Sequence, residues 1–349
     1  MLKLKNRFKL FPYVFAFFSV IGMMLLNGFA PSIALSAGEP VKIRMAVALG
    51  TTISQFMLMV PELLKHNKKS YDLELVQYFA SSAQIPVLAA EKIDIGWLDW
   101  SNMSSAVING GLDIKIIADL NQDKDPYWSN AYAVLDVSPY KNPADLKGKT
   151  IGVGAFGGIP DFVVREIMKK YGLEYPKDYN MVEVQLPTME AMLRDGKIDC
   201  GNFLNNIWYR AQQKGGLRIL FTHRDVFNPG QEIMHVARTE FIKKHRDALV
   251  DLMEDLIRVT RWFWNPANHK EAVRLASQRT KVPESAWEPW AFTKMDSYKS
   301  PDCLPNMEAI AKGFKWFYEN KYVSRPLDIN RYSDLTMVIE AKQRLESGK

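Results

Sequence analysis

The sequence lacks most of the motifs that mark a catalytic or metal-binding protein. Its 349 residues include two cysteines and five histidines. The histidines, at positions 66, 223, 235, 245 and 269, form no HExxH motif and no Cys/His ligand spacing. There is no GxSxG elbow and no GKS or GKT phosphate loop. We therefore expect no metal, no cofactor and no catalytic residue, in a protein that is not an enzyme.

A strongly basic tract is also missing. The formal net charge is +6, but four basic residues and no acidic residue precede Gly38, so the remainder carries six minus four, or +2. Proteins that bind nucleic acid need clustered Lys and Arg side chains to contact phosphates. Nucleic acid is therefore not an expected partner.

The N-terminus has the pattern of a secretory signal peptide. Basic residues precede an apolar run from residue 10 to residue 30, and small residues follow. We expect residues 1–37 to be the signal, with export to the periplasm and cleavage after Ala34, Ser36 or Ala37. The alternative is an uncleaved membrane anchor, because the run approaches spanning length; Asn27 and Pro31 interrupt it.

The two cysteines, Cys200 and Cys303, carry little information about a disulfide. An oxidising compartment would permit them to pair. Their separation along the chain says nothing about the distance between their Cα atoms. Two buried thiols are the favoured interpretation, and a disulfide is the alternative.

Strand-like and helix-like segments alternate after the signal. Apolar patterns predict strands at 41–49, 73–79, 93–97 and 114–118, with helices at 50–66, 80–91 and 101–111 between them. Such alternation predicts a mostly parallel sheet covered by helices on both faces.

An internal repeat indicates that this arrangement occurs twice. Lys-Ile-Asp-Ile-Gly at 92–96 and Lys-Ile-Asp-Cys-Gly at 197–201 each follow a strand, a helix and a strand. The alignment equates Cys200 with Ile95, which is a buried strand position. It also equates Asp94 with Asp199, and we interpret these two carboxylates as strand-edge caps rather than as an acid and a base.

We therefore expect an α/β protein of two lobes. The predicted boundaries are 38–133 plus 237–349 for lobe 1 and 134–236 for lobe 2. Strand-like runs at 132–137 and 233–237 are candidates for the two crossing segments. The part beyond Thr239 is predicted to be largely helical, at 247–264, 270–279 and 306–320, and to pack on lobe 1.

Several segments resemble the nitrate/sulfonate/taurine-type substrate-binding proteins of ABC transporters. The most specific is Asp-Leu-Lys-Gly-Lys at 145–149, followed by a strand, a Gly-bearing loop and a helix that ends at Tyr-Gly-Leu, 171–173. Residues 186–199 and 87–96 are similar to the same family. The resemblance covers about residues 41–237, and the tail agrees in its length and helical character.

The resemblance implies a two-lobe periplasmic-binding-protein fold of the second type, with ligand in the cleft between the lobes. It implies a monomer that delivers its ligand to an ABC permease in the inner membrane. Two departures, the loop at 154–160 and the sequence Trp-Leu-Asp-Trp at 97–100, argue against nitrate or a simple sulfonate. We expect a small organic acid, such as an aromatic carboxylate or sulfonate. The alternatives are an exported enzyme acting on a small heterocycle and a ligand-presenting sensor.

Ligands of such sheets lie beyond the carboxyl ends of the strands, where helix N-termini offer free N–H groups. Hydroxyl groups there can bind ligand or cap a helix, and tryptophans can form flat walls or pack the lobes. Paired glycines allow a close backbone approach, and amides can orient a ligand. The predicted ligand-binding residues are Thr51, Thr52, Phe79, Ser81, Ser82, Trp97, Asp99, Trp100, Ser101, Phe156, Gly157, Gly158, Asn202 and Asn205.

Overall fold

The computed structural model describes residues 39–48, 50–78 and 80–348. The predicted signal, residues 1–37, lies outside the described residues, and so does Phe79. Residues 39–349 form one compact unit by themselves. Among the helices of the described part, none is long and apolar enough to cross a membrane.

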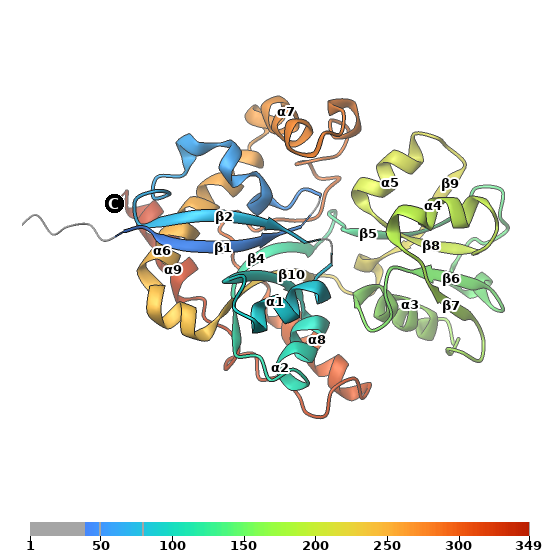
Figure 1. The fold of residues 1–349 in the computed structure, drawn as a ribbon. Helices are drawn as coiled ribbons and strands as arrows, with labels where there is room; N and C mark the ends of the chain where they lie inside the picture. The colour runs from blue at the N-terminus through green and yellow to red at the C-terminus, as the bar shows by residue number, and fades with distance from the viewer. Residues whose placement is uncertain (1–38, 49, 79, 349) are drawn as a thin grey trace, which may run out of the picture. The chain divides into compact units, whose positions relative to one another are not determined.

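The first of two five-stranded sheets has the strand order β2-β1-β3-β10-β4 (Figure 1). Its strands are β1 (Val41–Val47), β2 (Tyr71–Gln77), β3 (Ile95–Asp99), β4 (Ile114–Asp123) and β10 (Gly230–Arg238). β1 pairs in parallel with β2 and β3, and β10 runs antiparallel between β3 and β4. Four of the five strands therefore share one direction, as expected for a mostly parallel sheet.

The second sheet repeats this topology with the order β7-β6-β8-β5-β9. Its strands are β5 (Asn130–Leu135), β6 (Thr150–Val153), β7 (Asn180–Glu183), β8 (Cys200–Leu204) and β9 (Leu217–Thr222). Again the fourth strand of the order, β5, is antiparallel to its neighbours. The repeat predicted from the Lys-Ile-Asp segments is confirmed, because β3 and β8 are the central strands of the two sheets.

Helices cover both faces of each sheet (Figure 1). Around the first sheet lie α1 (Ile85–Ala89), α2 (Trp100–Ile108), α6 (Thr239–Phe263), α7 (His269–Thr280), α8 (Met307–Glu319) and α9 (Thr336–Ser347). Around the second sheet lie α3 (Ile159–Lys170), α4 (Leu186–Arg194) and α5 (Asn205–Gln212). We call the first sheet with its helices the first lobe, and the second sheet with its helices the second lobe.

Some predicted helices differ from those in the structure. The helix expected at 50–66 consists of two 3₁₀ helices, η1 (Ile53–Met59) and η2 (Pro61–Leu63), because Pro61 has no N–H to continue the first of them. The helix expected at 80–91 is shortened to η3 (Ser82–Gln84) and α1. The sequence analysis did not predict α9, which contacts α6.

The connections between the lobes differ from those expected. Residues 132–137 begin inside β5 of the second sheet, and residues 233–237 lie inside β10 of the first sheet. The chain passes between the sheets at 124–129 and 223–229 instead. Strand-like apolar runs pair within a sheet, whereas a crossing segment must leave the hydrogen-bonded ladder. Residues 230–236, expected in the second lobe, therefore belong to the first sheet.

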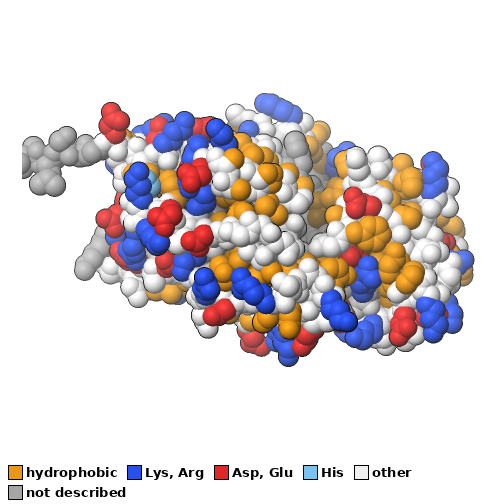
Figure 2. Space-filling model, turned by 60° about the horizontal axis from the view of Figure 1, so that its bottom comes forward, with side chains coloured by type: hydrophobic (Ala, Val, Ile, Leu, Met, Phe, Trp, Pro, Cys, Tyr) orange, Lys and Arg blue, Asp and Glu red, His pale blue; other side chains and the backbone are white. Residues whose placement is uncertain are grey.

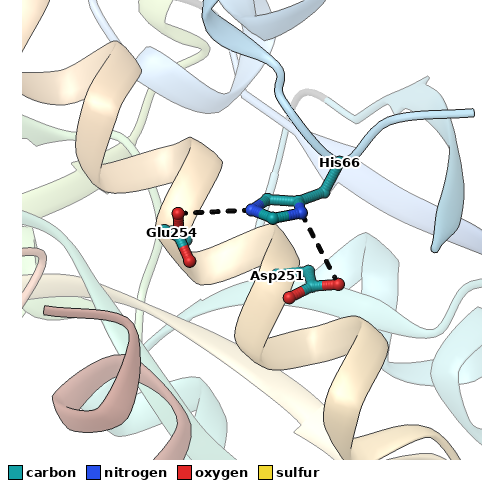
Figure 3. A group of neighbouring side chains, drawn as sticks. All are labelled: His66, Asp251 and Glu254. Carbon is teal, nitrogen blue, oxygen red and sulfur yellow. Dashed lines mark ion pairs between the residues drawn. The ribbon is translucent and has the colours of Figure 1, made fainter. Parts of the chain in front are cut away.

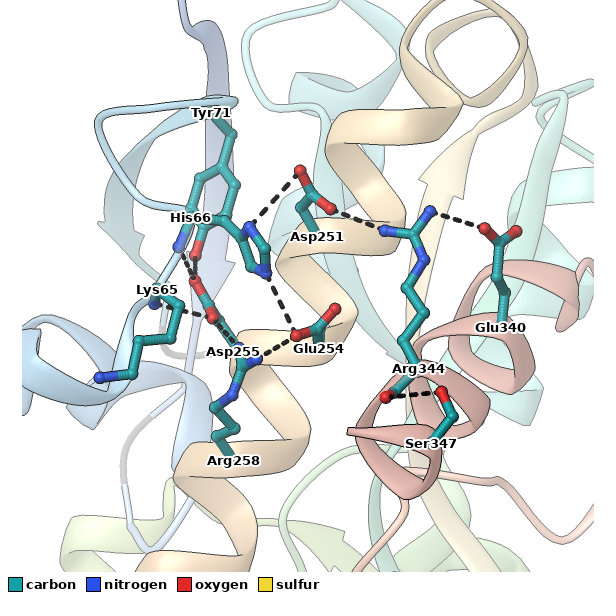
Figure 4. Close-up of polar contacts among 10 residues, drawn as sticks. All are labelled: Lys65, His66, Tyr71, Asp251, Glu254, Asp255, Arg258, Glu340, Arg344 and Ser347. Carbon is teal, nitrogen blue, oxygen red and sulfur yellow. Dashed lines mark hydrogen bonds and ion pairs between the residues drawn. The ribbon is translucent and has the colours of Figure 1, made fainter. Parts of the chain in front are cut away.

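A polar network ties α6 to the segment before β2 and to α9 (Figure 4). Asp255 is fully buried and accepts hydrogen bonds from the Tyr71 hydroxyl at 2.7 Å and from the backbone N–H groups of Lys65 and His66. Arg258 pairs with the same carboxylate at 2.6 Å. These bonds satisfy a buried charge, which would otherwise be costly to desolvate.

The outer surface carries charges of both signs. Figure 2 shows Lys and Arg side chains interspersed with Asp and Glu over the face drawn, and hydrophobic side chains near the groove between the lobes. No single-sign patch dominates that face. This distribution agrees with the expectation that the chain does not bind nucleic acid, which remains a prediction.

Candidate functional site

The carboxyl ends of the parallel strands of both sheets border the junction between the lobes. β1, β2 and β3 of the first sheet end next to residues 48 and 50–52, residues 78 and 80–82, and residues 99–101, and β6 and β8 of the second sheet end next to 154–158 and 205–206. The structure therefore places the predicted ligand-binding residues that it describes at strand ends or, for Trp97 and Asn202, near them.

Asp296 is the residue that joins the two lobes at this junction. Its Oδ1 accepts a hydrogen bond from the Thr51 hydroxyl at 2.8 Å and another from Asn205 Nδ2 at 3.1 Å. Thr51 follows β1 and Asn205 begins α5, so one buried carboxylate oxygen holds donors from both lobes. The sequence analysis missed Asp296, because the segment that carries it has no helical or strand pattern.

The polar residues after β3 form hydrogen bonds with one another. Asp99 caps α2 by accepting bonds from the N–H groups of Ser101 and Asn102, at 3.0 and 2.9 Å. Its Oδ2 accepts the Ser81 hydroxyl at 2.7 Å. Asp99 is therefore the N-cap residue of α2. Thr52 and Ser81 begin 3₁₀ helices without side-chain caps, and the Thr52 hydroxyl donates to the Ala48 carbonyl at 3.0 Å.

Trp100 fills the junction by stacking on a residue of the other lobe. Its ring lies 5.2 Å from that of Phe162 in α3, at an interplanar angle of 26°. Gly313 in α8 permits this placement, because a Cβ at that position would come within 2.6 Å of the Trp100 ring. The structure thus favours the packing interpretation of Trp100 over a ligand wall.

The loop before α3 is poorly suited to bind an anionic ligand. Gly157 has a φ of +72°, which favours glycine, and its N–H donates to Asp161 Oδ2 at 3.0 Å. Asp161 therefore occupies the N-terminal turn of α3, where an anionic ligand would otherwise bind. Gly158 is the N-cap residue of α3. Phe156 is 43% exposed, and Ser82 in η3 is exposed as well.

Trp97 and Asn202 occupy equivalent positions in the central strands of the two lobes. Trp97 is 6% exposed and Asn202 is 1% exposed. The Trp97 indole Nε1 and the Asn202 Oδ1 have no hydrogen-bond partner among the described residues. Asn202 Nδ2 donates to Asn130 Oδ1 at 3.2 Å. The first lobe holds further unsatisfied buried atoms, such as Ser54 Oγ and His235 Nδ1, but Trp97 and Asn202 are the two that lie at equivalent positions of the two central strands, one a donor and the other an acceptor. Such atoms require an explanation.

A second buried group lies where the chain crosses between the lobes. His223 Nδ1 lies 2.6 Å from Glu232 Oε1 and 3.8 Å from Asp123 Oδ2. Burial raises the pKa of Glu232 to about 7 and lowers that of His223 to about 4, and it raises the pKa of Asp123 well above its usual range. The sequence analysis did not connect these three residues.

Carboxyl groups outnumber basic groups in this buried region. Lys299 is buried, and burial lowers its pKa although Asp296, Asp119 and Asp123 act in the opposite direction. Burial also raises the pKa of Asp119 to about 6, against hydrogen bonds from Gln231 and the N–H of Ser300. The acidic groups here are therefore only partly balanced by positive charge.

Neither cysteine is suited to act as a nucleophile. Cys200 and Cys303 are unpaired and buried, as the favoured interpretation of the sequence predicted. Burial raises the pKa of Cys303 to about 12 and raises that of Cys200 still further. The thiolate is the reactive form, so both thiols are expected to be inert at neutral pH.

A third polar group lies away from the junction, on α6. The His66 ring stands between Asp251 and Glu254, with Nδ1 3.7 Å from one carboxylate and Nε2 3.2 Å from the other (Figure 3). Arg344 pairs with Asp251 and Arg258 with Glu254 (Figure 4). This group is therefore a charge-balanced network that holds three segments together.

Comparison with known proteins now gives the family. The model of the family described as NMT1/THI5 like matches residues 67–267, which is more than half of the chain. The chain belongs to the NMT1/THI5-like family. A search among curated proteins found no match.

Solved structures share the fold of this NMT1/THI5-like chain. The periplasmic aliphatic sulphonate binding protein SsuA from Escherichia coli superposes with a TM-score of 0.70 at 16% identity, over 84% of this chain and 92% of SsuA. The periplasmic nitrate-binding protein NrtA from Synechocystis PCC 6803 gives 0.69 at 14% identity, over 88% and 90%. The desulfurization enzyme DszB gives 0.66 at 12% identity, over 87% and 99%. The predicted two-lobe periplasmic-binding-protein fold is confirmed.

Proposed function

We propose that this NMT1/THI5-like protein is an extracytoplasmic solute-binding protein of an ABC importer. It captures a small molecule at the junction of its lobes and presents it to a membrane permease. The family, the two-lobe fold and the binding proteins among its structural neighbours support this function. The function requires different ligand affinities in the open and closed arrangements rather than catalysis. Export to the periplasm and action as a monomer are parts of the same proposal.

The observation that carries the proposal is the pair of unsatisfied atoms on Trp97 and Asn202. A buried polar atom without a partner costs about 1–3 kcal/mol. A ligand that accepts from the Trp97 indole and donates to Asn202 Oδ1 would remove that cost from both lobes at once. Because one atom belongs to each lobe, such a ligand would favour the closed arrangement.

The ligand class follows from which groups are still available. An organic acid, predicted from the sequence, needs several free donors, but the Thr51 hydroxyl and Asn205 Nδ2 already donate to Asp296. The available acceptor is an amide oxygen, and the carboxylate of Asp296, which binds Asn205 at the same junction, disfavours an added negative charge. We therefore propose a neutral nitrogen compound that carries both a donor and an acceptor, such as an amino-substituted heterocycle.

A thermal-shift screen of the purified protein in EDTA-containing buffer tests both parts of this proposal. The panel contains nitrate, alkanesulfonates, aromatic carboxylates, aliphatic amines and aminopyrimidines. A ligand that binds only the folded state raises the melting temperature in a saturable way. We expect this rise for a nitrogen compound. A rise with sulfonates or carboxylates alone would leave the binding function in place and overturn the ligand class.

Two variants connect a positive result to the site. Trp97→Phe removes the indole donor but keeps an aromatic ring, and Asn202→Ala removes the amide. Each should weaken binding about 10-fold or more, the effect of one lost buried hydrogen bond. Ser82→Ala, in an exposed residue, is the matched control and should bind normally. Conversion of the bound compound to a product would instead favour the exported-enzyme alternative.

A further inference from the structure

Asp123, His223 and Glu232 form a compact group in which each residue offers one metal-ligating atom. These atoms lie within 4.8 Å of one another, and the three residues are at most 6% exposed. They come from three segments: Asp123 ends β4, His223 follows β9, and Glu232 lies near the start of β10. The two segments that cross between the lobes begin or end at these residues.

The hydrogen bonds of Tyr132 assign the tautomer of His223. The Tyr132 hydroxyl donates its single hydrogen to the Pro160 carbonyl at 2.6 Å. Towards His223 Nε2, 3.4 Å away, it can therefore only accept, so Nε2 carries a hydrogen. In a neutral imidazole the lone pair then lies on Nδ1, which faces the two carboxylates. Three atoms with lone pairs converge, so either a proton on a carboxyl group or a bound cation must lie between them.

Neighbouring residues orient these three side chains as they do around metal sites. The N–H of Ser129 donates to Asp123 Oδ1 at 2.5 Å, and its hydroxyl donates to Oδ2 at 3.0 Å. Tyr132 fixes the ring of His223 from the opposite side. Histidine ligands typically use their second nitrogen in this way, and carboxylate ligands are typically hydrogen-bonded themselves.

We propose that Asp123, His223 and Glu232 bind a divalent first-row transition metal ion, such as Zn²⁺, through one imidazole nitrogen and two carboxylate oxygens. Ligand atoms of a tetrahedral zinc ion lie about 3.4 Å apart, and the separations of 2.6 and 3.8 Å from His223 Nδ1 lie on either side of that value. Three protein ligands leave a fourth position open. The ion would hold the ends of both crossing segments together.

The local charge and an adjacent pocket agree with this site. Of the two groups of His and carboxylate ligands in the described residues, the one at His66 already has Arg258 and Arg344 on its carboxylates, which would repel a cation. Among the ion pairs of the described residues, no arginine pairs with Asp123 or Glu232; the buried Lys299 interacts with the charge of Asp123 but forms no ion pair with it. Glu232 also lines a pocket of about 120 Å³ beside Trp100 and Phe227, so open space reaches one of the three proposed ligands.

Isothermal titration of the purified, EDTA-stripped protein with ZnCl₂ tests the proposal, with metal content after dialysis as a second measurement. We expect one ion per chain. Asp123→Asn and Glu232→Gln keep the size of each side chain and should each weaken binding at least about 10-fold, because each removes one charged ligand. The amide of Glu232→Gln can donate to His223 Nδ1, so this variant should stay folded. Circular dichroism in EDTA checks this.

His66→Gln is the matched control, because it removes the histidine of the other group. It should bind Zn²⁺ with the affinity of the unmodified protein. Loss of binding in His66→Gln but not in Glu232→Gln would place the ion on α6 and overturn the proposal. Absence of binding, or equal binding by every variant, would also overturn it. The small-molecule screen is carried out in EDTA, so its result does not depend on this site.

Discussion

Burial determines the protonation behaviour of several carboxyl groups in this protein. Asp119 is an example. Hydrogen bonds from Gln231 and Ser300 and the charge of Lys299 lower its pKa, but they do not offset the rise that burial causes. An acid whose pKa is higher in the folded state than in the unfolded state binds protons more tightly when folded. Its contribution to stability is complete below the unfolded pKa of about 4 and is lost as the pH rises through the folded pKa.

Asp119→Asn should remove this part of the pH dependence. In the unmodified protein, the folded pKa of about 6 predicts a loss of stability between about pH 4 and pH 6, on the order of 1–3 kcal/mol. The variant should show a flatter profile in urea unfolding at pH 4.5 and pH 7. Its stability at low pH should be lower, because its amide would face the N–H of Ser300. Asp195→Asn, at an exposed carboxylate, should keep the original profile; an unchanged profile in Asp119→Asn would contradict the prediction.

Trp97→Phe separates the two interpretations of that tryptophan without ligand. The smaller phenyl ring loses packing in a buried site, but removal of the unsatisfied N–H offsets part of this cost, so we expect the free energy of unfolding to fall by no more than about 2 kcal/mol. Urea unfolding of the ligand-free protein measures this. A larger loss would identify Trp97 as mainly a packing residue, and the site argument would fail.

At the scale of elements, the repeated Lys-Ile-Asp segment uses its aspartate in the same way in both lobes. Asp94 Oδ2 accepts the backbone N–H of Arg44 in β1, and Asp199 Oδ2 accepts that of Thr150 in β6, both at 2.9 Å. Both aspartates therefore join the central strand of a sheet to the strand beside it. The interpretation as strand-edge caps is confirmed. The surroundings differ, because Asp94 also pairs with Arg44 and Arg238, whereas Asp199 accepts the Tyr140 hydroxyl.

The equivalent substitutions should therefore have unequal costs. Burial raises the pKa of Asp94, but bonds from Arg44 and Arg238 lower it below its usual range overall. Asp94→Asn leaves two arginines without their partner and should cost about 3 kcal/mol. Asp199→Asn loses a weaker set of bonds and should cost about 1 kcal/mol. Chemical unfolding of both variants tests this order, and equal losses would show that the shared backbone bond dominates.

At the scale of the whole molecule, two separate sets of aromatic contacts hold the lobes together. Phe162 of the second lobe contacts Trp100 and Trp316 of the first lobe, with ring centres 5.2 and 4.5 Å apart. Tyr209 of α5 stacks on Trp290 at 5.4 Å and 8°. Such contacts favour the closed arrangement in the absence of ligand and reduce the free energy that ligand binding must supply.

Phe162→Ala should open the molecule as well as destabilise it. Loss of a fully buried phenylalanine costs about 3–5 kcal/mol. Because its partners belong to the other lobe, we also expect a larger radius of gyration by small-angle X-ray scattering. Phe221→Ala is the matched control, since Phe221 stacks on Tyr132 within the second lobe at 4.4 Å. It should lose stability without a change in radius; the same radius for both variants would contradict the interlobe role.

The order of strands and helices, the duplication and the burial of Cys200 followed from the sequence alone. The reason is that these depend on local periodicity and on a repeated segment of a few residues. The cap at Asp99 could also be predicted, because it depends on neighbours two and three positions away. The break at Pro61 could have been predicted from its missing N–H, but the 3₁₀ form of η1 could not, since it depends on packing against α6 and α7.

Only the tertiary structure decided which polar residues meet. Asp123, His223 and Glu232 are separated by 100 and 9 positions in sequence, and no spacing rule connects the first to the others. Asp296 reaches Thr51 from 245 positions away. Periodicity determines which face of a strand is buried, but the crossing of the chain between two sheets determines which buried groups share one site. The sequence by itself therefore determined the two-lobe architecture, whereas only the tertiary structure determined which polar side chains meet at the junction of the lobes.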